Sequence, residues 1–486
     1  MMTELAELTL AEIASAIRAR KASSVEVTRA LLARIETWQP AVNAFVRLEG
    51  EEALAAAAAA DAALASGRAK GALHGVPLAH KDMYYVAGKL AECGSKLRKG
   101  FVAPATSTAL VRLEKAGTIR LGALHMSEFA YGPTGHNAHL GPARNPWDPA
   151  RITGGSSSGS GAAVSARLVY AALGSDTGGS IRLPAHFCGV TGLKPTYGRV
   201  SRANAMPLSF SLDSVGPLAR TAEDCALIMA RVVGPDPLDA TTAEASPWDA
   251  HKAERRASDL TIGIPSAFYT EDLDTDVALT FDNALSTLRE LGVNLVSVRL
   301  PDQTAINAAA LIVLAVEATS AHAPWLRTRA DDYGPQVRAR LENGLAFSGV
   351  EYLEALRWRG PALAEHLAAI REVDAIVAPV ANSAAPTIAE TDVGAGDAAE
   401  LAIQKITRFM RLANYLGLPS LALPAGSSKG NLPIGIQLIG RPFGDETLVA
   451  LGRAFQAATD YHCKIPSGAL GHRPWQAGEN RLNQVP

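Results

Sequence analysis

Hydrophobic and polar positions along the chain alternate between helical and extended patterns. Thr9 and Glu12, like Ser23 and Glu26, have the spacing of a capping box, and each pair precedes a segment with helical apolar periodicity. The alanine-rich residues 53–65 predict a surface helix, because alanine is the strongest helix former. Residues 1–70 are therefore expected to form an N-terminal helical part.

Extended segments follow from residue 71 onward. Residues 167–176, "RLVYAALGSD", predict a buried strand, and residues 260–300 read as strand, helix and strand, a unit that favours parallel pairing. Helical periodicity fills 303–370, and strand-like segments precede a final helix from about residue 445. This alternation predicts an α/β fold with one large mixed, mostly parallel β-sheet sandwiched between layers of α-helices.

One polar stretch interrupts this order. Residues 234–259 contain prolines and show no apolar period, which indicates an exposed excursion within one domain. On this interpretation residues 1–486 form a single domain, with a core over 71–230 and a second half over 260–486. The helical region 303–370 is expected to act as a lid in that second half.

Composition narrows the class of protein. The 486 residues are 48% hydrophobic and have a formal net charge of -2. The chain therefore lacks the excess of positive charge that is typical of proteins that bind nucleic acids or membrane surfaces. The N-terminal stretch is acidic and amphipathic, unlike a signal peptide, and no run of about 18 uncharged apolar residues predicts a membrane span. The cysteines are scattered and suggest neither disulfides nor a zinc site: Cys93, Cys188, Cys225 and Cys463. We expect a cytoplasmic, metal-independent enzyme that is a monomer or a homodimer.

Residues 152–161, "ITGGSSSGSG", raise the question of a phosphate loop or a nucleophile. A P-loop needs a lysine, and none lies between Lys115 and Lys194. Gly155 to Gly159 match the nucleophile-elbow pattern G-x-S-x-G, centred on Ser157, but that motif follows a strand. The preceding residues carry two prolines and no strand pattern. From this loop alone, a flexible connection and a nucleophile elbow both remain open.

A second serine stands in "GSDTGGSIRLPA", residues 174–185. Gly178 and Gly179 precede Ser180 and would let a substrate approach backbone N–H groups, so Ser180 is a candidate nucleophile. A nucleophile needs a base. The histidines in the same third of the chain have no triad spacing with an acidic partner: His74, His80, His125, His136, His139 and His186. Lys81, beside Asp82 in an apolar setting, can act as a base only if burial lowers its pKa. Its ordinary interpretation is a surface lysine.

Taken together, these segments resemble the amidase signature family. The resemblance rests on "HGVPLAHKD" (74–82), "GALHMSEFAYG" (122–132), the 141–164 stretch and "GSDTGGSIRLPAHFCGVTGLKPTYGRVSR" (174–202), and it continues through 211–224 and segments near the C-terminus. Ser180 follows Ser156 by 24 residues, the spacing of that family. The resemblance implies the amidase-signature fold and a Ser–cis-Ser–Lys triad.

Carried over residue by residue, Ser180 is the nucleophile that forms the acyl-enzyme, and Ser156 relays protons between Ser180 and Lys81 across a cis Gly155–Ser156 peptide. The resemblance further implies an oxyanion hole made by Thr177, Gly178, Gly179 and Ser180, and a substrate pocket lined by Phe129, Ala130 and Tyr131. It implies no cofactor and no metal. Trp325, Phe347 and Tyr352 could line an acyl pocket, or belong to ordinary core.

The implied activity is hydrolysis of a C–N bond in a small amide-type substrate, such as an aliphatic or aryl amide, an anilide, a carbamate or a urea-like compound. One alternative is the catalytic subunit of a glutamine-dependent tRNA amidotransferase. The chain departs from that subunit in residues 337–359 and at Leu183, where the subunit usually has glutamine. A catalytically silent binding or scaffold protein is another alternative, against which the intact Lys81, Ser156 and Ser180 argue.

Overall fold

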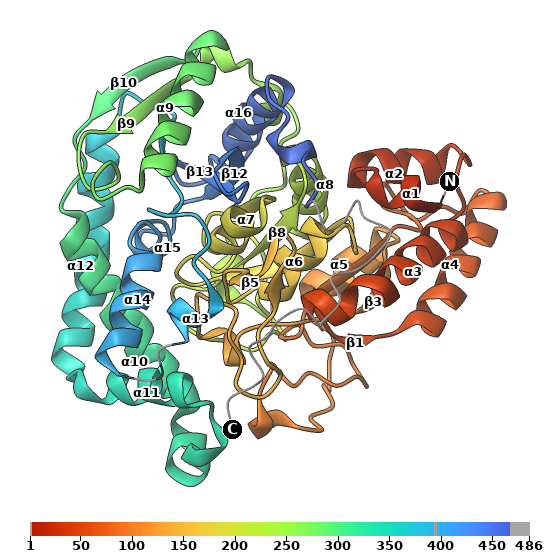
Figure 1. Cartoon of the computed structure of the whole chain (residues 1–486), viewed down its shortest axis with the longest axis horizontal. Helices are drawn as coiled ribbons and strands as arrows, with labels where there is room; N and C mark the ends of the chain where they lie inside the picture. Colours follow the sequence, from red (N-terminus) through yellow and green to blue (C-terminus); the bar gives the residue numbers. More distant parts are fainter. Residues whose placement is uncertain (1, 393, 395, 467–486) are drawn as a thin grey trace.

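A computed structural model describes residues 2–392, 394 and 396–466, with a large β-sheet in its middle and helices around it (Figure 1). Residues 1, 393, 395 and 467–486 of the expected single domain lie outside the described part. The sheet has eight strands in the order β10-β9-β11-β13-β12-β7-β8-β6. In chain order these strands are β6 Ala171–Asp176, β7 Thr191–Lys194, β8 Ser214–Ala219, β9 Thr261–Pro265, β10 Asn294–Val298, β11 Ala375–Pro379, β12 Ser420–Ser427 and β13 Pro433–Gly440.

The sheet is mixed, but the expectation that it is mostly parallel is wrong. In the described part of this sheet the parallel pairs are β9 with β10 and β9 with β11. The remaining neighbours, from β11 through β13, β12, β7 and β8 to β6, are antiparallel. The strand–helix–strand unit of residues 260–300 is parallel as predicted, since a helix connects its strands. The β12–β13 connection is short and turns the chain straight back, which makes that pair antiparallel.

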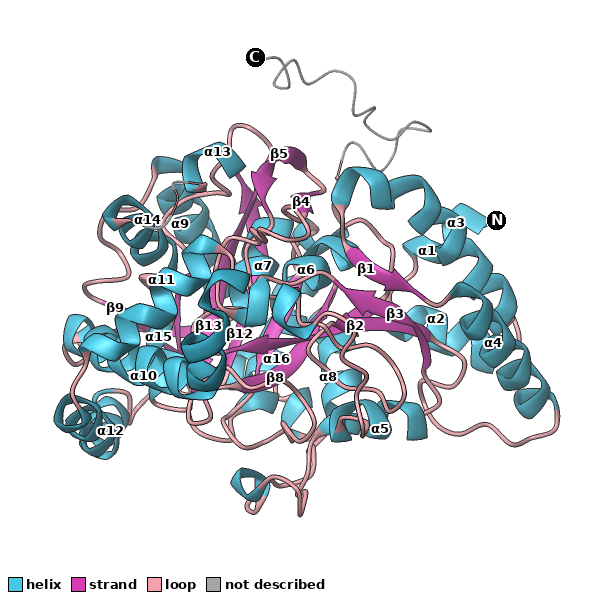
Figure 2. Ribbon diagram, turned by 90° about the horizontal axis from the view of Figure 1, so that it is seen from below, coloured by secondary structure: helices cyan, strands magenta, loops and turns pink. Residues whose placement is uncertain are grey.

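Helices cover both faces of this sheet (Figure 2). Helices α6 and α7 lie on one side, and α8 and α16 lie on the other. Their bounds are α6 Ser158–Ser165, α7 Arg182–Cys188, α8 Ala222–Val232 and α16 Asp445–Ala457, with α9 Thr275–Glu290 between β9 and β10. The layered α/β arrangement expected from the sequence is confirmed.

The N-terminal part forms its own layer at one end of the molecule (Figure 1). It contains α1 Met2–Glu7, α2 Leu10–Arg18, α3 Ser24–Val42, α4 Gly50–Ala65 and α5 Thr108–Lys115. A small sheet of order β1-β3-β2 lies beside them, with β1 Phe45–Leu48, β2 Pro77–Lys81 and β3 Ile119–Leu124. Both predicted capping boxes are present at the starts of α2 and α3, and the alanine-rich segment is helix α4.

The helical region after residue 303 lies at the opposite end of the molecule (Figures 1 and 2). It consists of α10 Gln303–Arg329, α11 Pro335–Asn343 and α12 Gly349–Ala369, and α13 Ile388–Thr391, α14 Asp397–Thr407 and α15 Arg411–Tyr415 follow β11. Among the described residues, one helical stretch, Gln303–Asp332, has the length and apolarity to cross a membrane, and half of its apolar window is buried in the protein. Buried Glu317 in that helix accepts hydrogen bonds from Ser209, Ser211 and Tyr352. These bonds attach α10 to α12 and to the loop before β8.

Residues 234–259 cross the surface between β8–α8 and β9. They form three short 3-10 turns, Ala240–Thr242, Lys252–Glu254 and Ala257–Asp259, and most of their side chains are exposed or half-buried.

Candidate active site

Strand β2 places Lys81 in the interior of the molecule. All five residues of this strand are buried, and Lys81, its last residue, is only 1% exposed. Lys81 Nζ lies 2.7 Å from Ser156 Oγ and 2.8 Å from Ser175 Oγ. Burial lowers the pKa of Lys81 to about 7, and the charges of Asp213 and Asp176 offset part of that effect. A substantial fraction of the amine is therefore neutral near pH 7. Because Lys81 is buried, its interpretation as a surface lysine is wrong.

The side chain of Asp82 points away from Lys81. Its carboxylate accepts hydrogen bonds from the N–H groups of Glu92 and Cys93 and from Arg47. The amine of Lys81 therefore faces serine hydroxyls and not the adjacent carboxylate.

The loop of residues 153–157, the glycine-serine loop, holds the Ser156 side chain in contact with Lys81. The Gly155–Ser156 peptide is cis, as the resemblance implied. A side chain at position 155 could not fit, since its Cβ would lie 2.5 Å from the carbonyl oxygen of Gly132. The other serines serve the scaffold: Ser157 binds the backbone of Ser175, Ser158 binds His125, and Ser160 binds the carbonyl of Leu173.

A short strand precedes this loop, although its residues show no strand pattern. Strand β5, Asp148–Ile152, pairs with β4, Arg144–Asn145, in a separate two-stranded sheet. Pro149 is tolerated because so small a sheet leaves backbone N–H groups outside the ladder. The strand and α6 thus flank the G-x-S-x-G segment, but the hydroxyl of its central Ser157 is buried and bound to the Ser175 backbone.

Ser180 lies in the turn between β6 and α7. Its side chain lines a cavity together with Thr177, Gly178, Ala130, Tyr131 and Leu314. The N–H group of Ser157 donates to the carbonyl oxygen of Ser180 at 3.3 Å, which joins this turn to the serine loop. Within the described part of the chain, no hydrogen bond connects Ser156 Oγ with Ser180 Oγ. The structure thus joins Lys81 to Ser156 directly and holds Ser180 beside them through backbone contacts.

The four expected oxyanion-hole residues are not equivalent. Gly179 donates its N–H group to Asp176 Oδ1 at 2.7 Å, so this donor is engaged inside the protein. Gly179 has a φ of +117°, and a Cβ there would lie 2.6 Å from Met410, so only glycine fits. In the described residues the N–H groups of Gly178 and Ser180 have no protein partner. These two donors are therefore free to bind the oxygen of a ligand.

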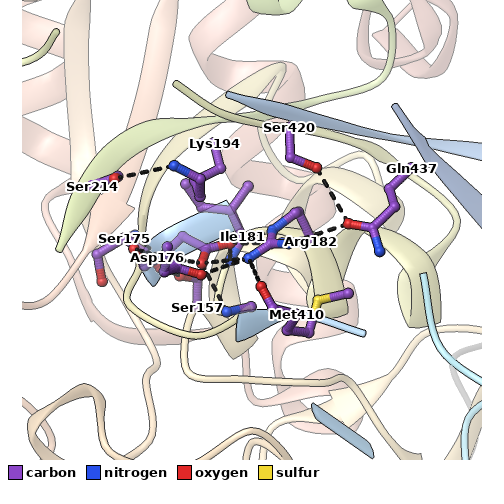
Figure 3. A network of polar contacts seen from close by, with 12 residues as sticks. Ser157, Ser175, Asp176, Ile181, Arg182, Lys194, Ser214, Met410, Ser420 and Gln437 are labelled. Atoms are coloured by element: carbon purple, nitrogen blue, oxygen red, sulfur yellow. Dashed lines mark hydrogen bonds and ion pairs between the residues drawn. The ribbon is translucent and has the colours of Figure 1, made fainter. Parts of the chain in front are cut away.

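A buried ion pair shapes this turn (Figure 3). Arg182 Nε lies 3.1 Å from Asp176 Oδ2, and both side chains are 0% exposed. Burial alone would raise the pKa of Asp176, but Arg182 and the N–H of Gly179 bring it well below its usual range. Arg182 also donates to Met410, Asn414 and Gln437. Asp176 and Arg182 thus form a structural pair that fixes the turn next to Ser180.

Lys194 and Ser175 are polar residues near the site that sequence reasoning missed (Figure 3). Lys194 is fully buried, donates to the carbonyl of Pro195, and has its pKa lowered by burial to about 7. Ser175 is adjacent to Asp176 in β6, and strand alternation sends these two side chains to opposite faces. No local pattern in the sequence indicates that the Ser175 hydroxyl lies beside Lys81, because β6 and β2 belong to different sheets.

The expected pocket residues separate into two groups. Ala130 and Tyr131 line the cavity with Ser180. Phe129 is not among the residues that line it; its buried ring stacks on Trp325, with centroids 5.3 Å apart, and packs edge-on against His322. Tyr352 donates to Glu317, and Phe347 is half-buried after α11. Neither is among the described residues that line this cavity. Arg340 and Arg411 do line it and were not predicted.

Comparisons with known proteins identify the family to which this chain belongs. The family profile described as Amidase matches residues 26–449. The A subunit of the glutamyl-tRNA(Gln) amidotransferase of Geobacter metallireducens is 40% identical over 94% of this chain and 99% of its own length. A solved structure described as a vestigial protein complex that reveals the evolutionary origins of an s-triazine catabolic enzyme is 34% identical, with a TM-score of 0.87 over 93% of this chain and 98% of its own.

A third relative is a peptide amidase. The native peptide amidase of Stenotrophomonas maltophilia is 29% identical, with a TM-score of 0.81 over 94% of this chain and 98% of its own. The family profile spans most of the chain, and the similar structures share its mixed sheet and helical layers. The chain therefore belongs to the amidase signature family and is an enzyme of the kind that acts on C–N bonds.

Proposed function

We propose that this protein hydrolyses a small amide-type substrate through an acyl-enzyme on Ser180. The observation that carries the proposal is the buried Lys81 amine, 2.7 Å from Ser156 Oγ and with a pKa lowered to about 7. A lysine that is partly neutral at neutral pH can serve as a base, whereas a solvated lysine cannot. Aliphatic and aryl amides, anilides, carbamates and urea-like compounds share the carbonyl carbon bonded to nitrogen that this chemistry needs.

In the proposed reaction, neutral Lys81 accepts the proton of Ser156, and Ser156 accepts the proton of Ser180. Ser180 Oγ then forms a bond to the carbonyl carbon, and the carbonyl oxygen becomes an oxyanion. The relay returns the proton to the substrate nitrogen, the C–N bond breaks, and ammonia or an amine leaves. Water then attacks the acyl carbon by the same relay, which frees the acid and restores Ser180.

Stabilisation of the oxyanion is assigned to the N–H groups of Gly178 and Ser180, with the backbone of Thr177 completing the turn. Gly179 supports them indirectly, because its N–H group holds Asp176 and fixes the turn. One oxyanion-hole donor typically contributes about 10²–10³-fold in rate. No step of this proposal requires a metal or an organic cofactor.

A second candidate is the catalytic subunit of a tRNA-dependent amidotransferase. It is favoured by the 40% identity to the amidotransferase protein of Geobacter metallireducens across 94% of the chain. Two features of the sequence argue against it. One is residues 337–359, which cover most of α11 and the first half of α12, and the other is Leu183 in α7. The two candidates differ in what they need: the amidotransferase subunit works with partner chains and tRNA, while a free-standing amidase works alone.

The test uses the purified full chain with a panel of small amides, anilides and carbamates, and follows release of ammonia or amine. We expect turnover of at least one substrate in the absence of glutamine, ATP and any partner protein. Ser180→Ala should abolish this turnover, whereas Ser258→Ala, a change in the exposed 234–259 segment, should not. Activity that depends on added partner chains and tRNA would favour the amidotransferase instead.

A further inference from the structure

Two arginine side chains reach the cavity that contains Ser180. Arg340 of α11 and Arg411 of α15 are 9% and 7% exposed, and both line the cavity. Arg340 is held by Tyr131: its Nη1 donates to the Tyr131 carbonyl at 3.1 Å, and its guanidinium lies 4.0 Å from the centre of the Tyr131 ring. Arg340 therefore has partners inside the protein.

Arg411 differs from Arg340 in this respect. Among the described residues, no hydrogen bond or ion pair engages its guanidinium, and Glu400, the acidic residue whose charge acts on it, is not in ion-pair contact. Burial, and to a lesser extent the charge of Arg340, lower the pKa of Arg411 to about 10, so it remains protonated at neutral pH. A buried cation without a counter-charge in contact with it is costly, and an anion that enters the cavity would remove that cost.

We propose that Arg411 recognises a carboxylate on the substrate, so that the preferred substrates are small amides that also carry a carboxylate group. This inference rests on the proposed function of the Ser180 cavity and specifies its substrate class. An arginine pairs with a carboxylate through charge-assisted, often bidentate, hydrogen bonds, which would also orient the amide toward Ser180.

The cavity also discriminates against a positive charge on the substrate. Of the described residues that line it, none is aspartate or glutamate, while two are arginine. The ammonium group of an α-amino acid would face these guanidinium groups without a compensating carboxylate. L-Glutamine is therefore a poorer fit than glutaramate, the same chain without the amino group.

The test compares kcat/KM for glutaramate with pentanamide, which has a methyl group in place of the carboxylate, and with L-glutamine. Succinamate and butanamide form a shorter pair. We expect the wild type to prefer the carboxylated member of a pair by at least about 30-fold, the lower end of what a buried charge pair contributes. Arg411→Met should remove that preference, because it should lower kcat/KM for the carboxylated member of each pair far more than for its neutral partner, and Arg411→Lys should retain part of it. Arg408→Met is the control, since Arg408 pairs with Glu271 and Asp272 on the surface.

Binding without turnover supplies a second readout. In Ser180→Ala, glutaramate should raise the midpoint of thermal unfolding, and it should not do so in Ser180→Ala/Arg411→Met. Arg411→Met alone should not lower the midpoint, because it removes no internal partner. Equal loss on charged and neutral amides, a lowered midpoint, or a preference for glutamine or pentanamide would overturn this inference while hydrolysis itself stands. Failure of the wild type on every amide would instead count against the proposed function.

Discussion

At the scale of single residues, Lys81 shows how burial determines chemistry. From the sequence it is a lysine beside an aspartate, and only the resemblance to a family marks it as a base. In the structure it is 1% exposed, and its amine contacts the hydroxyls of Ser156 and Ser175. That burial arises from β2, the 153–157 loop and β6, which are distant in sequence, so no local pattern could have predicted it.

The first prediction concerns pH. Because burial lowers the pKa of Lys81 to about 7, the neutral amine becomes the major form as pH rises through that value. We expect kcat/KM for a neutral amide to rise by about tenfold per pH unit below this pKa and to level off above it. The measurement is kcat/KM between about pH 5 and 9, with unfolding followed at each pH. A profile that is flat or falls across this range would show that Lys81 is not the base.

The second prediction concerns the proton relay. Lys81→Ala and Ser156→Ala should each lower kcat by about 10²–10⁴-fold, the usual contribution of a positioned general base. The double variant should be little worse than either single one, because residues that act as one relay are not additive. Lys89→Ala is the matched control, since Lys89 is a surface lysine that pairs with Glu52. Losses that multiply in the double variant would mean that the two residues share no proton path.

At the scale of elements, the turn between β6 and α7 carries the candidate nucleophile. The carboxylate of Asp176 accepts from the N–H groups of Gly179 and Ile181 and from the Arg182 side chain. One carboxylate therefore fixes the backbone on both sides of Ser180. The sequence shows the residues of this turn but not the pairing, which also depends on Asn414 and Gln437 from distant elements.

The third prediction follows from that ion pair. Arg182→Met leaves the Asp176 charge buried without its partner, and we expect it to lower the free energy of unfolding by about 3–5 kcal/mol. Arg338→Met breaks exposed contacts of α11 with Asp331 and Glu342, and it should cost less than about 1 kcal/mol. Denaturant unfolding of the two variants provides the comparison. Equal stability of both variants would contradict the role given to the pair.

Local pattern predicted several elements and failed at others for identifiable reasons. The capping boxes, the alanine-rich helix, strand β6 and the β9–α9–β10 unit all have signals within a few residues, and all are present. Strand β5 was missed because Pro149 is rare inside a strand. The prediction of a mostly parallel sheet was wrong because the order and direction of neighbouring strands are set by contacts between distant segments. In this chain β7 lies between β8 and β12 and not beside β6.

At the scale of the whole molecule, the candidate site is assembled from both halves of the chain. Tyr131 and Ser180 come from the first half, while Leu314, Arg340 and Arg411 come from the helices of the second. The signature motifs predicted the first group. The second group has no motif, because its position depends on how α10, α11 and α15 pack over the sheet.

The fourth prediction tests this shared cavity. Leu314 is 6% exposed and lines the cavity, so Leu314→Ala should enlarge it. We expect kcat/KM to shift in favour of amides with a bulkier acyl chain by about 10-fold or more, the usual effect of one or two methylene groups in an apolar pocket. Leu345→Ala, at a position that is 70% exposed in the same helical region, should leave the ratio unchanged. An unchanged ratio in Leu314→Ala would place the acyl group elsewhere.

The proposed mechanism depends above all on Ser180 being the residue that becomes acylated. The decisive experiment treats the purified wild-type chain with a serine-reactive phosphonyl fluoride and locates the adduct by peptide mass mapping. We predict one label, on Ser180, that is lost in Ser180→Ala and forms much more slowly in Lys81→Ala. A label on Ser157, the centre of the G-x-S-x-G segment, or a label that forms at the same rate without Lys81, would contradict it.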